Sequence, residues 1–190
     1  MIDGNTLLTK ALDELRIDLS RLVARCSIWV HPEVFHRLNS FRPNAVWFPD
    51  CRRVRVGEKV KSKVDGVCLD DNSKANLAIK NAVFAGAKHD CKGMHACHVW
   101  PKSCYDVRYH TSLANIVLLP AALAGFSDYD DDIAEMLKFR SFQLFGWVPE
   151  NEARPVRPAS YPDELEWAPL RPVEKPVLQR IDRLRRNDDN

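Results

Sequence analysis

The sequence has no strong excess of one charge and no long apolar run. Its 190 residues carry a formal net charge of only +2 at pH 7, so any surface for a polyanion must be a local patch rather than an overall field. No uninterrupted apolar stretch is long enough to span a membrane, so we expect no membrane partner. The first residues lack the basic-then-apolar order of a secretory signal, and we therefore expect a cytoplasmic protein.

The six cysteines include no Cys-x-x-Cys pair, which weakens a zinc-ribbon interpretation. Reduced thiols in the cytosol are the expected state. One segment nevertheless leaves a structural zinc ion open, because it gathers five potential ligands within fourteen residues: Cys91, His95, Cys97, His98 and Cys104. The alternative is that the cysteines of this segment are small buried hydrophobic residues, with one or two functional members.

Glycine is absent after Gly146, and proline becomes frequent. Seven of the twelve prolines lie between residues 149 and 176, which is too many for a helix or a central strand. We expect residues 149–190 to form an extended arm that wraps the domain or a partner. The arm would end in a short basic helix from Pro176 to Arg186.

Hydrophobic residues make up 45% of the chain, which is enough to bury a core. Apolar residues recur at helical spacing through residues 5–25, and this pattern predicts one amphipathic helix. Pro32 suits the first turn of a second, short helix that continues through Leu38. Residues 1–50 are therefore interpreted as an N-terminal helical region.

A basic segment follows, in residues 51–69. Valines and arginines alternate with period two, and Gly57-Glu58 offers a turn, so we expect a β-hairpin. The segment contains six cationic residues and only two acidic ones. The cationic residues are Arg52, Arg53, Arg55, Lys59, Lys61 and Lys63. They are open to two interpretations: a solvated hairpin edge, or a ribbon that contacts the phosphates of nucleic acid.

The next predicted helix begins at Lys74 and ends near Ala85. Ser73 is a good N-cap for this helix, and Gly86 suits its C-terminus. Together with the basic hairpin it would form a unit of residues 51–93.

Two short apolar segments, each stopped by proline, come next. Residues 95–100 and 116–119 are predicted strands, because Pro101 and Pro120 end their pairing. His98 lies in the first strand, and Asn115 opens the second one seventeen residues later.

An amphipathic helix is expected after the second strand. Ser127 or Asp128 would cap it, the acidic residues that follow suit its N-terminal dipole, and Gly146 would end it.

This order of strand, loop, strand and helix suits the cleavage of a phosphodiester. A neutral imidazole can accept a proton from water near pH 7. A divalent ion can neutralise charge on the phosphate and on the leaving oxygen. The imidazole must be held in one tautomer, which a side-chain amide or a backbone carbonyl can do. His98 and Asn115 are the candidates for the first and the third part.

The pattern A-C-H-V-W-P, followed by H-T-S-L-A-N-I-V-L-L-P, resembles the HNH endonuclease family, with its ββα-metal or His-Me finger fold. The resemblance covers roughly Met94–Trp147. It implies an α+β fold with the ββα-metal core in residues 94–148, and a metal-dependent endonuclease that acts on double-stranded DNA. His98 matches the general base of the family. Asn115 matches its middle asparagine, whose amide orients the base.

The metal ligands depart from the family pattern. The residue before the base is usually Asp or His, but here it is Cys97, whose thiolate suits Zn²⁺ better than Mg²⁺. The family's ligand on the final helix is missing, so Asp128 is the first candidate and His110 the second. Mg²⁺, Mn²⁺, Ni²⁺ and Zn²⁺ all stay open. Strand alternation would put His95 and Cys97 on one face and His98 on the other.

Each of these residues also has a plainer interpretation. A lone histidine on an apolar strand can be a satisfied core residue, Asn115 can simply hold a turn, and Asp128 can be only a helix cap.

Three hypotheses follow. The leading one is the endonuclease, a nicking or double-strand-cutting restriction or phage-defence effector, with a homodimer or a larger effector complex for double-strand cleavage. The second is a zinc-stabilised nucleic-acid- or protein-binding module, with Cys91, His95, Cys97 and Cys104 as ligands. The third is a degenerate nuclease fold kept for assembly.

Overall fold

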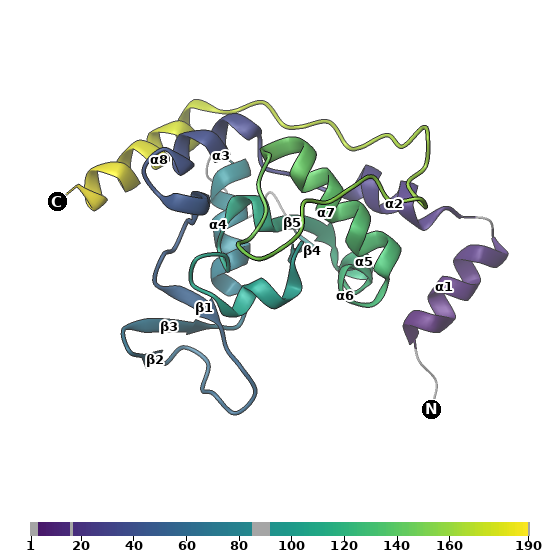
Figure 1. The fold of residues 1–190 in the computed structure, drawn as a ribbon, viewed down its shortest axis with the longest axis horizontal. Coiled ribbons are helices and arrows are strands. Elements are labelled where there is room, and N and C mark those ends of the chain that lie inside the picture. The colour runs from purple at the N-terminus through teal and green to yellow at the C-terminus, as the bar shows by residue number, and fades with distance from the viewer. Residues whose placement is uncertain (1–3, 16, 85–91, 190) are drawn as a thin grey trace.

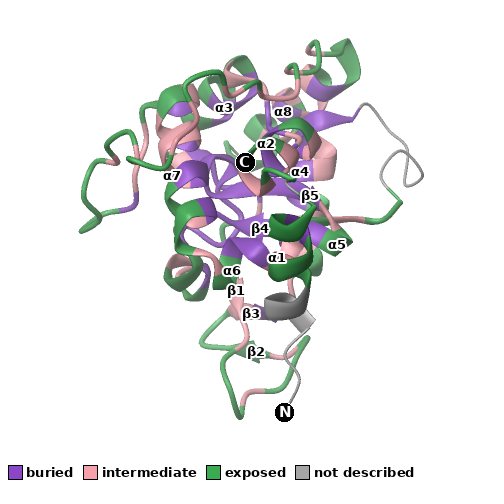
Figure 2. Ribbon diagram, turned by 90° about the vertical axis from the view of Figure 1, so that its right-hand side faces the viewer, coloured by how far each residue is buried: buried purple, intermediate pink, exposed green. Residues whose placement is uncertain are grey.

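The computed structural model describes residues 4–15, 17–84 and 92–189, with side chains from residue 8 onward. Two antiparallel strands, β4 (Met94–His98) and β5 (Ile116–Pro120), lie at the centre, and His98 pairs with Ile116. All four residues from Ile116 to Leu119 are fully buried, since helices cover the strands (Figures 1 and 2). The helices in contact with β5 include α2 (Leu19–Cys26) and α4 (Ser73–Val83). The chain is therefore an α+β protein, as predicted.

The N-terminal segment forms two helices rather than one. Helix α1 spans Gly4–Glu14, and α2 begins only at Leu19. The predicted single helix over residues 5–25 is wrong because Asp18 is extended and acts as an N-cap, accepting a hydrogen bond from the backbone N–H of Arg21 at 3.1 Å. The second predicted helix is confirmed as α3 (Pro32–Asn39), with proline in its first turn.

A second, small sheet has the strand order β1-β3-β2. Strand β1 (Cys51–Arg53) runs parallel to β3 (Val67–Asp70), whereas β2 (Lys63–Val64) pairs with β3 in antiparallel fashion. The hairpin is thus β2–β3, and its turn is Asp65-Gly66, both with positive φ as a two-residue hairpin turn prefers. The predicted turn at Gly57 exists, but it lies inside the β1–β2 connection. We call residues 54–66 the basic lobe; it projects from the body in both views (Figures 1 and 2).

Helix α4 is capped differently from the prediction. Its N-cap is Asn72, in the left-handed conformation, and not Ser73. Asp70, the last residue of β3, accepts hydrogen bonds from the Lys74 backbone N–H at 2.9 Å and from the Ser73 hydroxyl at 2.7 Å. A carboxylate from the preceding strand therefore satisfies this helix end. The predicted C-terminal residues, Ala85 and Gly86, lie outside the described residues.

Short helices α5 (Ala121–Ala124) and α6 (Phe126–Tyr129) follow β5 directly, before the long helix α7 (Asp131–Phe145). The N-cap of α7 is Asp130, whose carboxylate accepts from the Ile133 backbone N–H at 3.0 Å. Asp128 lies within α6, so the prediction that Ser127 or Asp128 caps the long helix is wrong. Gly146, with φ of 62°, ends α7 as predicted.

Residues 147–174 contain no helix or strand and run across the body as an extended arm (Figure 1). The Trp167 ring packs edge-on against Trp29, and the Ala168 N–H donates to the Ala24 carbonyl at 3.0 Å. Helix α8 (Lys175–Asp188) then packs beside α3, where Arg37 pairs with Asp182 at 2.7 Å. The extended arm and its terminal helix are thus confirmed.

Short 3₁₀ helices occupy Pro43–Ala45, Pro101–Tyr105 and Leu113–Asn115. Across the ranges that the structure describes, no helix has both the length and the apolar composition that crossing a membrane requires.

Candidate active site

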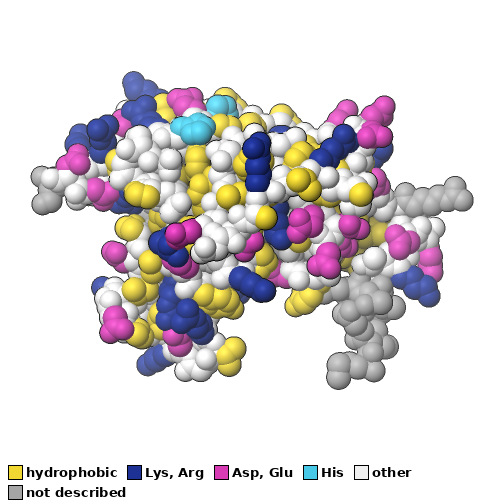
Figure 3. All heavy atoms as spheres, viewed as in Figure 1, with side chains coloured by type: hydrophobic (Ala, Val, Ile, Leu, Met, Phe, Trp, Pro, Cys, Tyr) yellow, Lys and Arg dark blue, Asp and Glu magenta, His cyan; other side chains and the backbone are white. Residues whose placement is uncertain are grey.

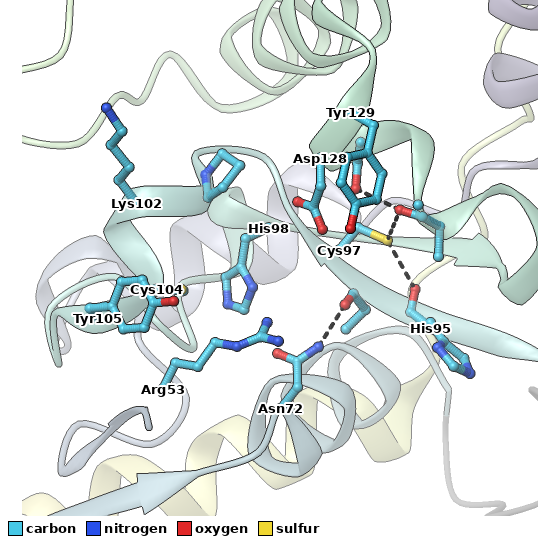
Figure 4. A pocket seen from close by; sticks show the side chains of 15 residues that line it. Arg53, Asn72, His95, Cys97, His98, Lys102, Cys104, Tyr105, Asp128 and Tyr129 are labelled. Atoms are coloured by element: carbon cyan, nitrogen blue, oxygen red, sulfur yellow. Dashed lines mark hydrogen bonds between the residues drawn. The ribbon is translucent and has the colours of Figure 1, made fainter. Parts of the chain in front are cut away.

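A cleft of about 550 Å³ opens where the small sheet β1-β3-β2 meets the central strand pair β4-β5 (Figure 4). Several elements supply its walls: the end of β1, the start of α4, strand β4, the 3₁₀ helix after it, and α6. The lining side chains with polar or ionisable groups are Arg53, Asn72, His95, Cys97, His98, Lys102, Cys104, Tyr105, Ser127, Asp128 and Tyr129. The cleft therefore combines one buried imidazole with cations, a carboxylate and thiols.

His98 is the last residue of β4 and is 4% exposed. Its Nε2 lies 2.9 Å from the backbone carbonyl oxygen of His110. Because a carbonyl oxygen can only accept, Nε2 must carry the proton, and Nδ1 keeps its lone pair. Nδ1 has no hydrogen-bond partner among the described residues, and Figure 4 shows the ring among the side chains of the cleft. This is the tautomer that a proton acceptor requires.

The surroundings of His98 also favour its neutral form. Burial, with the nearby His110 and Arg53, lowers its pKa to about 3, and the hydrogen bond to the His110 carbonyl opposes this fall. The imidazole is thus uncharged at neutral pH.

Asn115 is fully buried, and the hydrogen bonds of its amide go to groups other than the His98 ring. The amide oxygen accepts from the Trp100 N–H at 3.0 Å, while the amide nitrogen donates to the Ser103 hydroxyl at 2.8 Å and to the Tyr109 carbonyl at 3.0 Å. These bonds hold the loop between the two strands. Asn115 can therefore influence His98 only indirectly, through the loop that carries the His110 carbonyl.

The predicted metal ligands are not all brought together. Cys97 and Asp128 line the cleft, whereas His110 is fully buried outside it, with Nε2 2.9 Å from an oxygen of Asp70. His95, Cys97 and His98 all line this one cleft, and His98 is the last residue of β4.

The chemistry of the two cleft donors differs. Burial raises the pKa of Cys97 to about 11, so it is a thiol at neutral pH, and its Sγ lies 3.7 Å from the Ala124 carbonyl oxygen and 3.8 Å from that of His95. Asp128 is more exposed. Partial burial of its carboxyl group raises its pKa, and the charge of Arg53 opposes this rise.

No group of three or more His, Cys, Asp or Glu side chains is arranged to hold a metal ion within the described ranges. The structural zinc ion considered from the sequence would need four ligands, of which the structure describes three. His95, Cys97 and Cys104 line the same cleft, and Cys91 lies outside the described residues. The described cysteines are free thiols.

The six predicted nucleic-acid-binding cations separate into three groups. Arg52 of β1 forms a two-point ion pair with Glu58, with distances of 2.8 and 2.6 Å, which ties the basic lobe to β1. Arg53 points into the cleft, and the described residues offer its guanidinium no hydrogen bond or ion pair. The remaining four lie exposed on the lobe, which Figure 3 shows at the lower left: Arg55, Lys59, Lys61 and Lys63.

Sequence reasoning missed two features of this region. Arg53 was grouped with the surface cations, although it faces His98 across the cleft (Figure 4). Asp70 was not singled out, although it is 3% exposed and binds His110. The run Asp70-Asp71-Asn72-Ser73 directly after an apolar strand was the available signal, because acids at that position often interact with a following helix N-terminus.

Comparison of the chain with models of protein families, with curated proteins and with solved structures finds no match. What the cleft can do must therefore be inferred from its own geometry.

Proposed function

We propose that this chain is a metal-dependent endonuclease of the HNH type, which hydrolyses phosphodiester bonds of double-stranded DNA. The observation that carries the proposal is the hydrogen bond from His98 Nε2 to the His110 carbonyl, which leaves Nδ1 free at the cleft. The order of β4, β5 and the helices that follow supports the proposal, because strand, strand and helix is the order that a ββα unit would have. The sequence resemblance around His98 and Asn115 supports the same function.

In the proposed reaction, Nδ1 of His98 accepts a proton from the attacking water. A pKa of about 3 makes the imidazole a weak base in the free protein. Bound DNA would make His98 a stronger base, because an anionic phosphate beside the ring favours the protonated imidazole and raises its pKa. Arg53, whose guanidinium faces the cleft without a partner among the described residues, would contact the phosphate oxygens and stabilise the charge that builds up there.

Asp128 and Cys97 are the residues that would hold a divalent ion. Two protein ligands suit an ion that takes its remaining ligands from water and from the substrate phosphate. The buried thiol would have to lose its proton to bind, so Asp128 is the stronger donor for a hard ion. When bound, such an ion neutralises negative charge on the phosphate and on the leaving oxygen.

One imidazole in one cleft would cut one strand. A double-strand break would then require a homodimer or a partner subunit in a larger complex. A cytoplasmic restriction or phage-defence effector is the role we propose for such an enzyme.

Incubation with supercoiled plasmid tests the function directly. The protein is given Mg²⁺, Mn²⁺, Ni²⁺ or Zn²⁺ in turn, and nicked and linear products are measured. His98→Ala should lower the rate by about 10²- to 10⁴-fold. His36→Ala, which changes an exposed histidine on α3, is the matched control and should cut normally. The proposal is refuted if no ion supports cutting, or if His98→Ala cuts at the wild-type rate.

A further inference from the structure

A buried contact between Asp70 and His110 lies directly behind the His98 imidazole. His110 is 0% exposed and Asp70 is 3% exposed, and they belong to segments forty residues apart. The same Asp70 carboxylate caps α4, so it is fixed by the sheet on one side and by the helix on the other. Burial alone would raise the pKa of Asp70, but hydrogen bonds from His110, Ser73 and Lys74 lower it to about 2. The anchor for His110 is therefore a rigid carboxylate anion.

The position of the His110 side chain fixes the position of its backbone carbonyl. That carbonyl is the group that accepts the Nε2 proton of His98 at 2.9 Å. The loop around it is held elsewhere by Asn115, which binds the carbonyl of the neighbouring residue Tyr109. Asp70 and Asn115 thus hold two successive residues of one loop from two sides.

Beside these favourable hydrogen bonds, the arrangement has one unfavourable feature. Nδ1 of His110 is buried and has no hydrogen-bond partner within the described part of the chain, and burying an unsatisfied polar atom is unfavourable. An apolar side chain at this position would avoid that loss, but it could not bind Asp70.

We propose that Asp70 and His110 are positioning residues that hold His98 as the Nε2-protonated tautomer, with Nδ1 directed at the cleft. The proposal rests on the proposed function, because the proton acceptor of that reaction is Nδ1. Neither residue contacts the substrate: Asp70 acts on His110, and the His110 carbonyl acts on His98.

The tautomer of His98 can be measured without any cleavage assay. In protein labelled with nitrogen-15 at histidine, two-bond nitrogen–proton correlation spectra distinguish a protonated ring nitrogen from a bare one. Wild-type His98 should give the pattern of pure Nε2–H. His110→Ala should give a mixture of the two tautomers. His110→Gln should restore the wild-type pattern, because the glutamine amide can donate to Asp70 as Nε2 of histidine does.

Cleavage rates and DNA affinity complete the test. His110→Ala should reduce turnover about 10- to 100-fold, the range for loss of a group that orients a reactive side chain, while affinity for a short DNA duplex stays unchanged. His36→Gln, at an exposed position on α3, controls for histidine replacement. Asp70→Ala should match His110→Ala; if it does not fold, the two His110 variants still decide.

The positioning role is overturned if His110→Ala leaves the His98 spectrum unchanged, or if His110→Gln does not restore it. If wild-type protein cuts no DNA with any ion, the proposed function fails, yet the spectra still show whether His110 sets the tautomer. The two failures are therefore distinguishable.

Discussion

The imidazole rings of His98 and His110 are stacked, with centroids 5.1 Å apart and planes inclined by 18°. Two imidazolium ions in this arrangement would repel one another, and both rings are buried. Burial and the neighbouring His110 both lower the pKa of His98, so the His98 ring stays neutral at pH 7.

The depressed pKa of His98 makes stability depend on pH in a defined window. The unfolded chain binds a proton near pH 6.5, whereas the folded chain does so only near pH 3, so the contribution of this group is fully present above pH 6.5 and is lost as pH falls towards 3. The loss should approach about 1.4 kcal/mol per pH unit. Urea unfolding at pH 7, 6, 5 and 4 without metal measures it. His98→Gln should show a shallower dependence, and an equal slope would contradict the assignment.

Asn115→Ala should lower both stability and turnover. The substitution leaves the Trp100 N–H and the Tyr109 carbonyl without their partner, and an unsatisfied buried group costs about 1–3 kcal/mol. Asn115→Asp is the informative comparison, because it keeps the acceptor for Trp100 and loses both donors. Thermal or urea unfolding gives the stabilities. A variant with wild-type stability and reduced turnover would show instead that Asn115 acts on the reaction itself.

The exposed cations of the basic lobe should carry much of the non-specific DNA affinity. Each phosphate contact contributes about 0.9 to the slope of log affinity against log salt concentration. Lys61→Ser with Lys63→Ser should therefore reduce the slope by up to about 2. Arg183→Ser with Arg185→Ser removes two exposed cations from α8 and serves as control. An unchanged slope in the lobe variant would mean that the lobe faces away from DNA.

Asp128→Ala should raise the metal concentration needed for half-maximal cutting without weakening α7. The matched control is Asp130→Ala, which removes the true N-cap of α7 and should cost about 1 kcal/mol of stability without a shift in the metal titration. If the two variants give the same metal midpoint, Asp128 is not a ligand.

Cys97→Asp should move the metal preference towards Mg²⁺, since a hard oxygen replaces a soft sulfur. Cys97→Ser is the control, because it keeps the size of the side chain without adding a carboxylate. Plasmid nicking across the four ions is the readout. An unaltered order of ion preference in Cys97→Asp would remove Cys97 from the set of ligands.

The central part of the fold could be predicted because its signals are local. Proline after each apolar segment marks the ends of β4 and β5, and Gly146 marks the end of α7. The break before α2 was missed because the apolar spacing continues through it, although α1 ends at Glu14 and Asp18 caps the start of a new helix. The alternation of Val54 and Val56 suggested a strand, but β1 ends at Arg53 and both valines lie in the β1–β2 connection. Periodicity also cannot show that β1 is parallel to β3.

The candidate site could be predicted only in part, because only some of its residues lie close together in the sequence. His98 and Asn115 belong to one short motif, whereas Arg53 and Asp70 reach the site from a different sheet. Their positions depend on how that sheet packs against the strand pair, which no spacing along the chain encodes.

The packing of the second half of the arm and of α8 against the body has a consequence for proteolysis. Trp167 and Ala168 fix its second half, and Val177 and Ile181 of α8 are buried in the core, while residues 151–154 are exposed. A protease that nicks this exposed stretch would cut the chain without releasing α8. The two fragments would stay associated as a non-covalent complex, and a nicked molecule would run as one species on a sizing column but as two bands after denaturation.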